Sequence, residues 1–161
     1  MRPRHKIPAP VSAPPRRVLM RELGLLRQSL REHGIREASD YAEVLIAEVL
    51  RGRRAASGVT KGHDVVSNKF GRVEVKCRQL PIDGRIEERV ELSPAKEAGF
   101  DHLAIVVFRP DFTVKGAVVV PYKAVWELVR RHQYNRITYQ HARSLDGAID
   151  ITAEVCAAAN R

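Results

Sequence analysis

Two long apolar runs in the second half of the chain constrain the fold most. They are His102–Phe108 (HLAIVVF) and Val114–Val120 (VKGAVVV), rich in β-branched residues, and the residues RPDF between them are typical of a turn. Such apolar strands belong inside a sheet, and helical patterns lie at both ends of the chain. The sequence therefore predicts an α/β fold with a central mixed β-sheet flanked by helices.

The helices are predicted from apolar residues that recur every three or four positions. The sequence predicts helices over Arg16–His33, from Ser39 or Asp40 to about Arg51, over Ala95–Ala98, over Pro121–His132 and over Asp150–Ala159. Arg89–Leu92 is predicted to extend the sheet, and the polar residues 133–147 to form a connection. The leucines of the first helix fit either packing on their own domain or a short dimer seam, so a homodimer is one interpretation.

The length of 161 residues fits one domain with an apolar core. We expect residues 16–161 to form it, with a core at about 39–131, behind a flexible, basic, Pro-rich arm at residues 1–15. No stretch approaches the roughly 18 apolar residues that a membrane span needs. Cys77 and Cys156 have no zinc-site spacing and suit a reducing compartment. A cytoplasmic protein without membrane contact is expected.

The charge of the chain is concentrated at its start. The formal net charge is +9, and residues 1–36 hold nine Lys or Arg against two acids, so 9 − 2 = +7 of it lies there. A basic excess favours a polyanionic partner. The basic segment is predicted either to contact phosphates or to be a solvated tail that aids solubility.

A hairpin is predicted over residues 63–78. The run His63–Ser67 (HDVVS) is followed by NKFG, a natural turn, and then by the strictly alternating RVEVKCR. In the second strand, Glu74, Lys76 and Arg78 share the face opposite to the apolar residues. The hairpin would bring Asp64 within reach of Glu74 and Lys76.

These three side chains suit phosphodiester hydrolysis. Mg²⁺ prefers oxygen ligands, so Asp64 and Glu74 are candidate metal ligands. Lys76 beside them can help to activate the attacking water and offset the charge that builds on the phosphate. An E-x-K pattern alone is weak evidence, because exposed strand faces often carry alternating charges that pair across the sheet.

The segment GHDVV, followed by GRVEVKCR, resembles the D…ExK core of the PD-(D/E)XK nuclease superfamily. The resemblance covers roughly Tyr41 to Val129, and the element order resembles the superfamily's αβββαβ core, here with an extra N-terminal helix. It implies a restriction endonuclease-like fold and a DNA endonuclease that uses Mg²⁺, for which Mn²⁺ can substitute. It also implies that Asp64 and Glu74 bind the metal with the Val75 carbonyl, that Lys76 assists the nucleophile, and that Glu43 is the helix acid. His63 stands where the superfamily's name has proline.

Several alternatives stay open from the sequence alone. Glu43 could instead complete a capping box with Asp40, and Glu48 is the other candidate helix acid. The basic residues near the motif are predicted either to contact DNA phosphates or to keep a loop soluble; they are Arg51, Arg53, Arg54 and Lys61. Arg78, on the strand, is predicted either to contact a phosphate or to be a solvated surface arginine. The whole chain could also be a DNA-binding or scaffolding module that does not cleave, or a basic protein whose first helix binds a partner.

Overall fold

The structure is a computed structural model that describes residues 14–56, 62–82, 88–92, 99–132 and 135–161. The chain divides into two compact units, Met1–Arg36 and Glu37–Arg161. The first unit contains α1 (Arg16–Glu32), which agrees with the predicted helix to one residue. Its leucine stripe, Leu19, Leu23, Leu26 and Leu30, is between 39% and 62% exposed. No helix among the described residues has the length and apolar character to cross a membrane.

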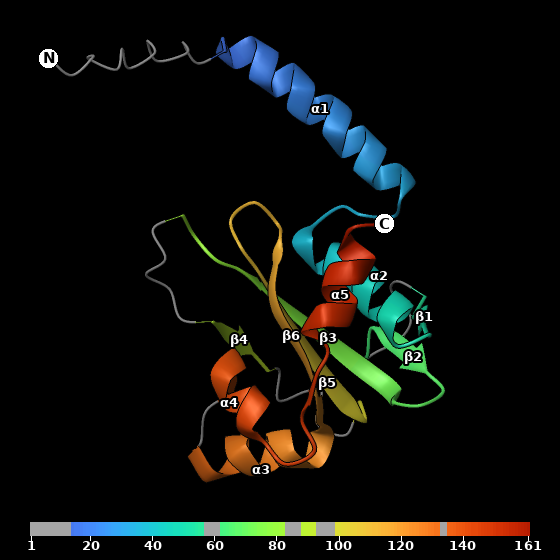
Figure 1. The fold of residues 1–161 in the computed structure, drawn as a ribbon, viewed down its shortest axis with the longest axis vertical. Helices are drawn as coiled ribbons and strands as arrows, with labels where there is room; N and C mark the ends of the chain where they lie inside the picture. Colours follow the sequence, from blue (N-terminus) through green and yellow to red (C-terminus); the bar gives the residue numbers. More distant parts are fainter. Residues whose placement is uncertain (1–13, 57–61, 83–87, 93–98, 133–134) are drawn as a thin grey trace, which may run out of the picture. The chain divides into compact units, whose positions relative to one another are not determined.

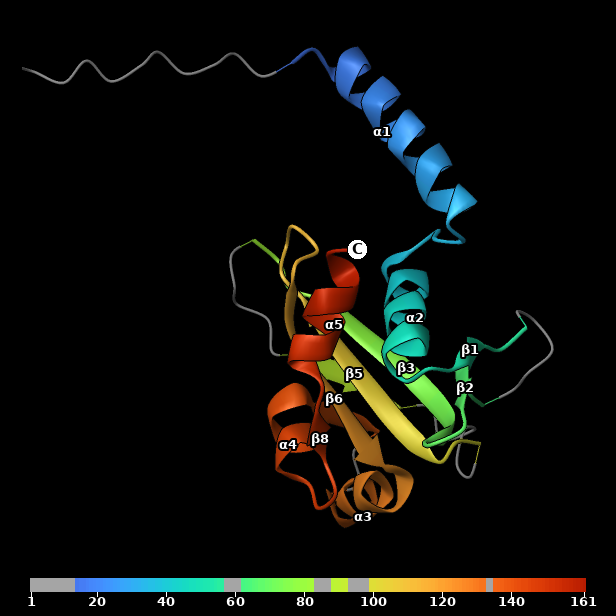
Figure 2. The ribbon, with the colours of Figure 1, turned by 45° about the vertical axis from the view of Figure 1, so that its right-hand side comes forward.

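The second unit contains a six-stranded mixed sheet in the order β1-β2-β3-β5-β6-β8 (Figures 1 and 2). Its strands are β1 (Arg53–Arg54), β2 (Val65–Ser67), β3 (Gly71–Gln79), β5 (His102–Phe108), β6 (Val114–Pro121) and β8 (Ile149–Asp150). Only β3 and β5 run parallel, and all other neighbours are antiparallel. Helices flank this sheet: α2 (Ala38–Val49), α3 (Tyr122–His132), α4 (Tyr139–Ser144) and α5 (Thr152–Ala159). The predicted α/β class with a mixed central sheet is confirmed.

Two apolar cores cover the two faces of the sheet. Alternate residues of β5 divide between them: Ala104, Val106 and Phe108 pack with α2 and α5, whereas Leu103 and Ile105 pack with α3 and α4. Figures 1 and 2 show α2 and α5 side by side on their face. Burial on both faces explains why the two central runs are continuously apolar. The core also continues beyond residue 131, as far as Ala158.

The structure corrects three predictions in the second half of the chain. Arg89–Leu92 does not extend the main sheet, because β4 (Arg89–Glu91) pairs with β7 (Arg136–Thr138) in a separate two-stranded sheet. The predicted polar connection contains β7 and α4, whose Ile137, Tyr139 and Ala142 are buried. The last helix begins at Thr152 because Ile149 and Asp150 pair with β6. The helix predicted over Ala95–Ala98 lies outside the described residues.

The start of α2 also differs from the prediction, with a consequence for the site. The N-cap is Glu37, and its backbone N–H donates to Asp40 Oδ2 at 3.2 Å in a capping box formed by these two residues. Asp40 therefore lies within the first turn instead of capping the helix. The capping box that could have explained Glu43 does not form, so Glu43 is left for another role.

The end of α2 turns sharply into β1. Gly52 N–H donates to Ala47 O and Arg51 N–H to Glu48 O, while Arg51 has a φ of 50°, in the left-handed region. This bonding is a Schellman motif, in which glycine is usual at the position of Arg51. Gly52 lies against β2, where a Cβ atom would stand 2.6 Å from Val66 O. The turn directs the chain back along β2, toward Asp64.

Candidate active site

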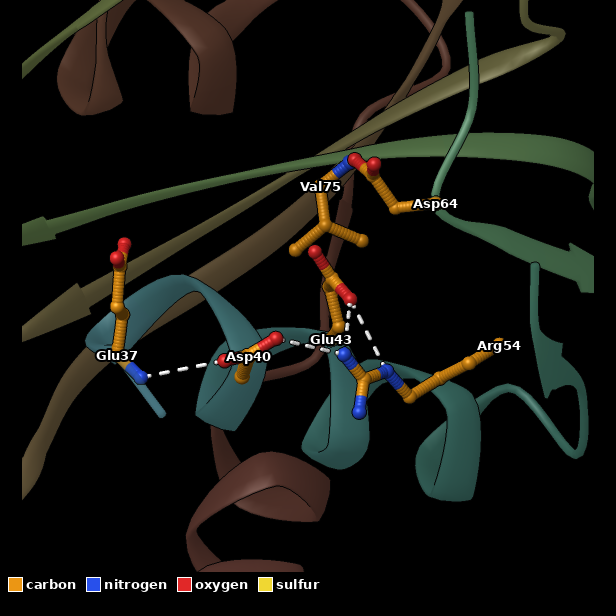
Figure 3. Close-up of polar contacts among 6 residues, drawn as sticks. All are labelled: Glu37, Asp40, Glu43, Arg54, Asp64 and Val75. Atoms are coloured by element: carbon orange, nitrogen blue, oxygen red, sulfur yellow. Dashed lines mark hydrogen bonds and ion pairs between the residues drawn. The ribbon is translucent and has the colours of Figure 1, made fainter. Parts of the chain in front are cut away.

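Asp64 immediately precedes β2, and its carboxylate lies along the edge of β3. The ladder between β2 and β3 ends at the pair Val65–Val73, and Asp64 N–H donates to Val73 O at 2.9 Å. Beyond this point the Asp64 side chain follows β3, where Oδ2 accepts a hydrogen bond from Val75 N–H at 2.8 Å (Figure 3). The predicted hairpin therefore brings Asp64 to the residue between Glu74 and Lys76.

Glu74 and Lys76 form an ion pair on one face of β3. Lys76 Nζ lies 2.8 Å from Glu74 Oε1, and their side chains are 26% and 1% exposed. The predicted alternation is confirmed, since Val73 and Val75 belong to the core on the opposite face. Burial of a carboxylate costs free energy even when it is paired. A buried, paired carboxylate beside a second acid is therefore a candidate for function.

The oxygen donors around Val75 suit Mg²⁺. In a strand, the N–H and C=O of one residue point to the same edge, so the Val75 carbonyl is directed to the edge where Asp64 bonds its amide. Asp64 and Glu74 supply carboxylates on either side of this residue. Among the described residues, no three acidic, histidine or cysteine side chains gather as a metal site. One or two carboxylates are nevertheless the usual protein ligands of Mg²⁺, which keeps several waters, so Asp64 and Glu74 are the side chains that such an ion would use here.

Glu43 projects from α2 toward the same edge of β3. Figure 3 shows its carboxylate between the Arg54 guanidinium and Val75. Burial raises the pKa of Glu43, and the nearby charge of Asp64 raises it further, whereas the Arg54 hydrogen bond lowers it. Glu48 is exposed and pairs with Arg161. Of the two predicted helix acids, Glu43 is thus the one near Asp64.

The basic residues predicted to contact DNA differ in their surroundings. Arg54 is bonded to acids of α2, and Lys61 lies outside the described residues. Arg78 shares the face of Glu74, and its Nε atom is buried with no hydrogen-bond partner within the described part of the chain. Arg51 and Arg53 are exposed and available to a ligand.

Lys69 is an exposed basic residue to which neither the sequence interpretation nor the contacts described below assign a role. With Asn68, Phe70 and Arg51 it lines a shallow hollow where the turn after β2 meets the end of α2. Its ammonium group lies 5.1 Å from the centre of the Phe70 ring.

No protein-family model matches the sequence, and no curated protein matches it significantly.

Proposed function

We propose that the protein is a Mg²⁺-dependent DNA endonuclease of the PD-(D/E)XK type, on a restriction endonuclease-like fold. The observation that carries the proposal is the hydrogen bond from Val75 N–H to Asp64 Oδ2. It joins an acid that precedes β2 to the middle residue of Glu74-Val75-Lys76. An aspartate bonded to this residue thus stands beside a strand that carries a buried glutamate and a lysine, and side chains of these kinds support the proposal of metal-assisted phosphodiester hydrolysis.

Each residue has a role in this proposal. Asp64, Glu74 and the Val75 carbonyl would hold Mg²⁺, and the bound ion would supply positive charge that polarises the phosphate and favours ionisation of a water. The water oxygen attacks phosphorus and loses a proton to solvent, while the bond from phosphorus to the leaving oxygen breaks and that oxygen takes up a proton from solvent. Lys76 orients the water and offsets negative charge on the phosphate oxygens. Its ion pair with Glu74 keeps the ammonium group at this position.

The proposal is tested by incubating the full-length protein with supercoiled plasmid, linear duplex, branched DNA and RNA in Mg²⁺, Mn²⁺ or EDTA. We expect cutting of DNA in either metal and none in EDTA. A chain with one such site cuts one strand per encounter, so nicked plasmid should appear first unless two copies associate. Preference among the DNA substrates would define the specificity.

A second candidate is a DNA-binding or scaffolding module that does not cleave. The observations that favour it are that Glu43 is paired with Arg54, and that no three acidic, histidine or cysteine side chains of the described residues gather as a metal site. This candidate predicts salt-sensitive DNA binding without cutting in any metal. Such a result would remove the catalytic roles proposed for Asp64, Glu74 and Lys76.

Replacing Arg51 with glycine should weaken DNA binding without destabilising the fold. The change removes an exposed cation, and it places the residue that Schellman motifs favour at a left-handed position, which should add about 1 kcal/mol of stability. Fluorescence anisotropy in EDTA should show weaker binding with a shallower salt dependence, and thermal unfolding an equal or higher Tm. Lys123→Gly is the control, because it removes the same charge from an exposed position on α3. Equal losses of affinity in both variants would contradict a contact at Arg51.

A further inference from the structure

Helix α1 carries its leucine stripe outside any apolar core of its own unit, because none of its residues is buried. The described members of both apolar cores in the second unit lie from Tyr41 onward, so that unit covers its sheet with its own helices. A continuous apolar stripe in contact with water is a mark of an interaction surface. The partner can be identified from the residues beside the stripe.

The leucine stripe has the spacing of a two-stranded coiled coil, since successive leucines are four, three and four positions apart. In the heptad notation abcdefg, the four leucines alternate between d and a, the positions that form the seam between two helices. Positions e and g flank the seam, and their charges determine the partner and the orientation. In α1, Glu22 and Ser29 are at g, whereas Met20 and Arg27 are at e.

Glu22 and Arg27 fit a parallel pair of identical helices. In a parallel pair, a g residue faces the e residue of the next heptad in the other helix, so Glu22 would face the partner's Arg27. The two-fold symmetry of a homodimer makes this ion pair occur twice. In an antiparallel pair g faces g and e faces e, so Glu22 would face Ser29 and Arg27 would face Met20. Only the parallel arrangement pairs opposite charges.

Glu22 also favours a second helix over a membrane surface as the partner. The residues three and four positions away from it share its side of the helix, and all of them are apolar: Val18, Leu19, Leu25 and Leu26. A helix that lies in a membrane surface keeps its charges on the opposite, polar face. A carboxylate within the apolar side opposes such binding, but it would meet a guanidinium in a pair of α1 helices.

We propose that α1 is a dimerisation helix: two copies of the chain join their leucine stripes in parallel, and Glu22 of each copy forms an ion pair with Arg27 of the other. The assembly is closed, because both copies use the same surface. The inference goes beyond the proposed function and does not depend on it. If the chain is a nuclease with one site, the dimer would supply the second site that cutting of both strands requires.

Sedimentation equilibrium of the full-length protein over a wide concentration range tests the seam by measuring the Kd of the dimer. We expect Leu26→Gln to raise this Kd by about tenfold or more, because each helix loses a leucine from the seam. Leu25→Gln is the matched control: Leu25 is 59% exposed and Leu26 is 62% exposed, but Leu25 is at position c, outside the seam. Its Kd should equal that of the wild type, and equal effects of the two substitutions would overturn the proposed seam.

Exchange of the two charges tests the orientation. Glu22→Arg and Arg27→Glu each replace both ion pairs with like charges, and each should weaken the dimer by about tenfold. The two variants change the net charge in opposite directions, so a loss in both cannot come from net charge. The double variant, Glu22→Arg with Arg27→Glu, has the composition of the wild type and should recover its Kd. A double variant no tighter than the single ones would overturn the parallel pairing.

Gly24→Ala should strengthen the dimer. Gly24 is at position b, away from the seam, and an added Cβ atom has no heavy atom within 4 Å. A helix of 17 residues is marginally stable alone, and alanine favours the helix over glycine, so the Kd should fall by about tenfold. An unchanged or higher Kd would contradict pairing through α1.

The state of the wild type decides the proposal as a whole. A protein that stays monomeric at its highest soluble concentration would overturn it. Binding of that monomer to vesicles of phosphatidylcholine and phosphatidylserine would then assign the leucine stripe to a membrane surface. If Leu26→Gln loses helical circular dichroism, the recovery of the Kd by the charge-exchanged double variant carries the same test.

Discussion

Replacing Lys76 with alanine is expected to lower the rate of Mg²⁺-dependent DNA cleavage by about 100-fold or more. The Lys76 ammonium group is paired with Glu74, and the residue between them, Val75, donates its N–H to Asp64. Loss of the ammonium group therefore removes positive charge from the position proposed for the phosphate. Single-turnover cleavage of a labelled duplex, with enzyme in excess, measures this step without a contribution from product release. DNA binding in EDTA should change little, because one phosphate contact among many is removed.

Lys69→Ala is the control for this experiment. It removes the same charge from an exposed position in the turn after β2, and the cleavage step should keep its wild-type rate. Glu74→Gln complements the Lys76→Ala variant, because the amide keeps the shape of the buried Glu74 side chain but removes the charge that would bind Mg²⁺. If the alanine variants of Lys76 and Lys69 cut DNA equally fast, the proposed role of Lys76 is wrong.

Phe108→Ala is expected to destabilise the protein by about 3–5 kcal/mol, the range for truncating a fully buried aromatic side chain. Phe108 is 0% exposed at the end of β5, and its ring stacks on Tyr41 in the first turns of α2, with centroids 5.4 Å apart. The change leaves a cavity between α2 and the sheet. Urea unfolding followed by far-UV circular dichroism would measure the loss of stability.

Phe112→Ala provides a matched comparison within the same aromatic cluster. The ring of Phe112 lies 5.9 Å from that of Phe108, but its side chain is 42% exposed and its φ of 64° is in the left-handed region. Its truncation should cost less than about 1 kcal/mol. Similar losses for the two variants would show that the core under α2 is not packed around Phe108 as described.

The sheet could be predicted from the sequence because its central strands carry a strong signal. The apolar run of β5 and the alternation in β3 each extend over seven or more residues and mark burial directly. The short strands could not be predicted. Two or three residues, as in β1 and β4, contain no measurable period, and their pairing depends on partners distant in the sequence.

The start of α2 shows how a local rule can favour the wrong residue. Glu37 and Asp40, like Asp40 and Glu43, are three positions apart, so both pairs have capping-box spacing. Asp is a preferred N-cap and Glu is not, which favours Asp40. In the folded chain Asp40 instead binds Arg54, a contact across fourteen positions that requires β1 to fold back on α2.

One part of the candidate site could be predicted from the sequence, because it depends only on the local features of one hairpin. Asp64, Glu74 and Lys76 lie on one hairpin, whose turn and alternation determine their proximity. The partner of Glu43 was not predictable, because Arg51, Arg53 and Arg54 form one basic stretch in the sequence. Only the pairing of β1 with β2 directs Arg54 to the face of α2.

The central claim is tested most directly by comparing the wild-type protein with Asp64→Asn on supercoiled plasmid, in Mg²⁺ and in EDTA. Asparagine is nearly isosteric, and its carbonyl oxygen can still accept the Val75 hydrogen bond, so the hairpin should stay intact while a metal-binding charge is lost. We predict that the wild type nicks the plasmid in Mg²⁺ only, and that Asp64→Asn, with an unchanged Tm, leaves it supercoiled. Equal cutting by both proteins, or cutting by the wild type in EDTA, would contradict the claim.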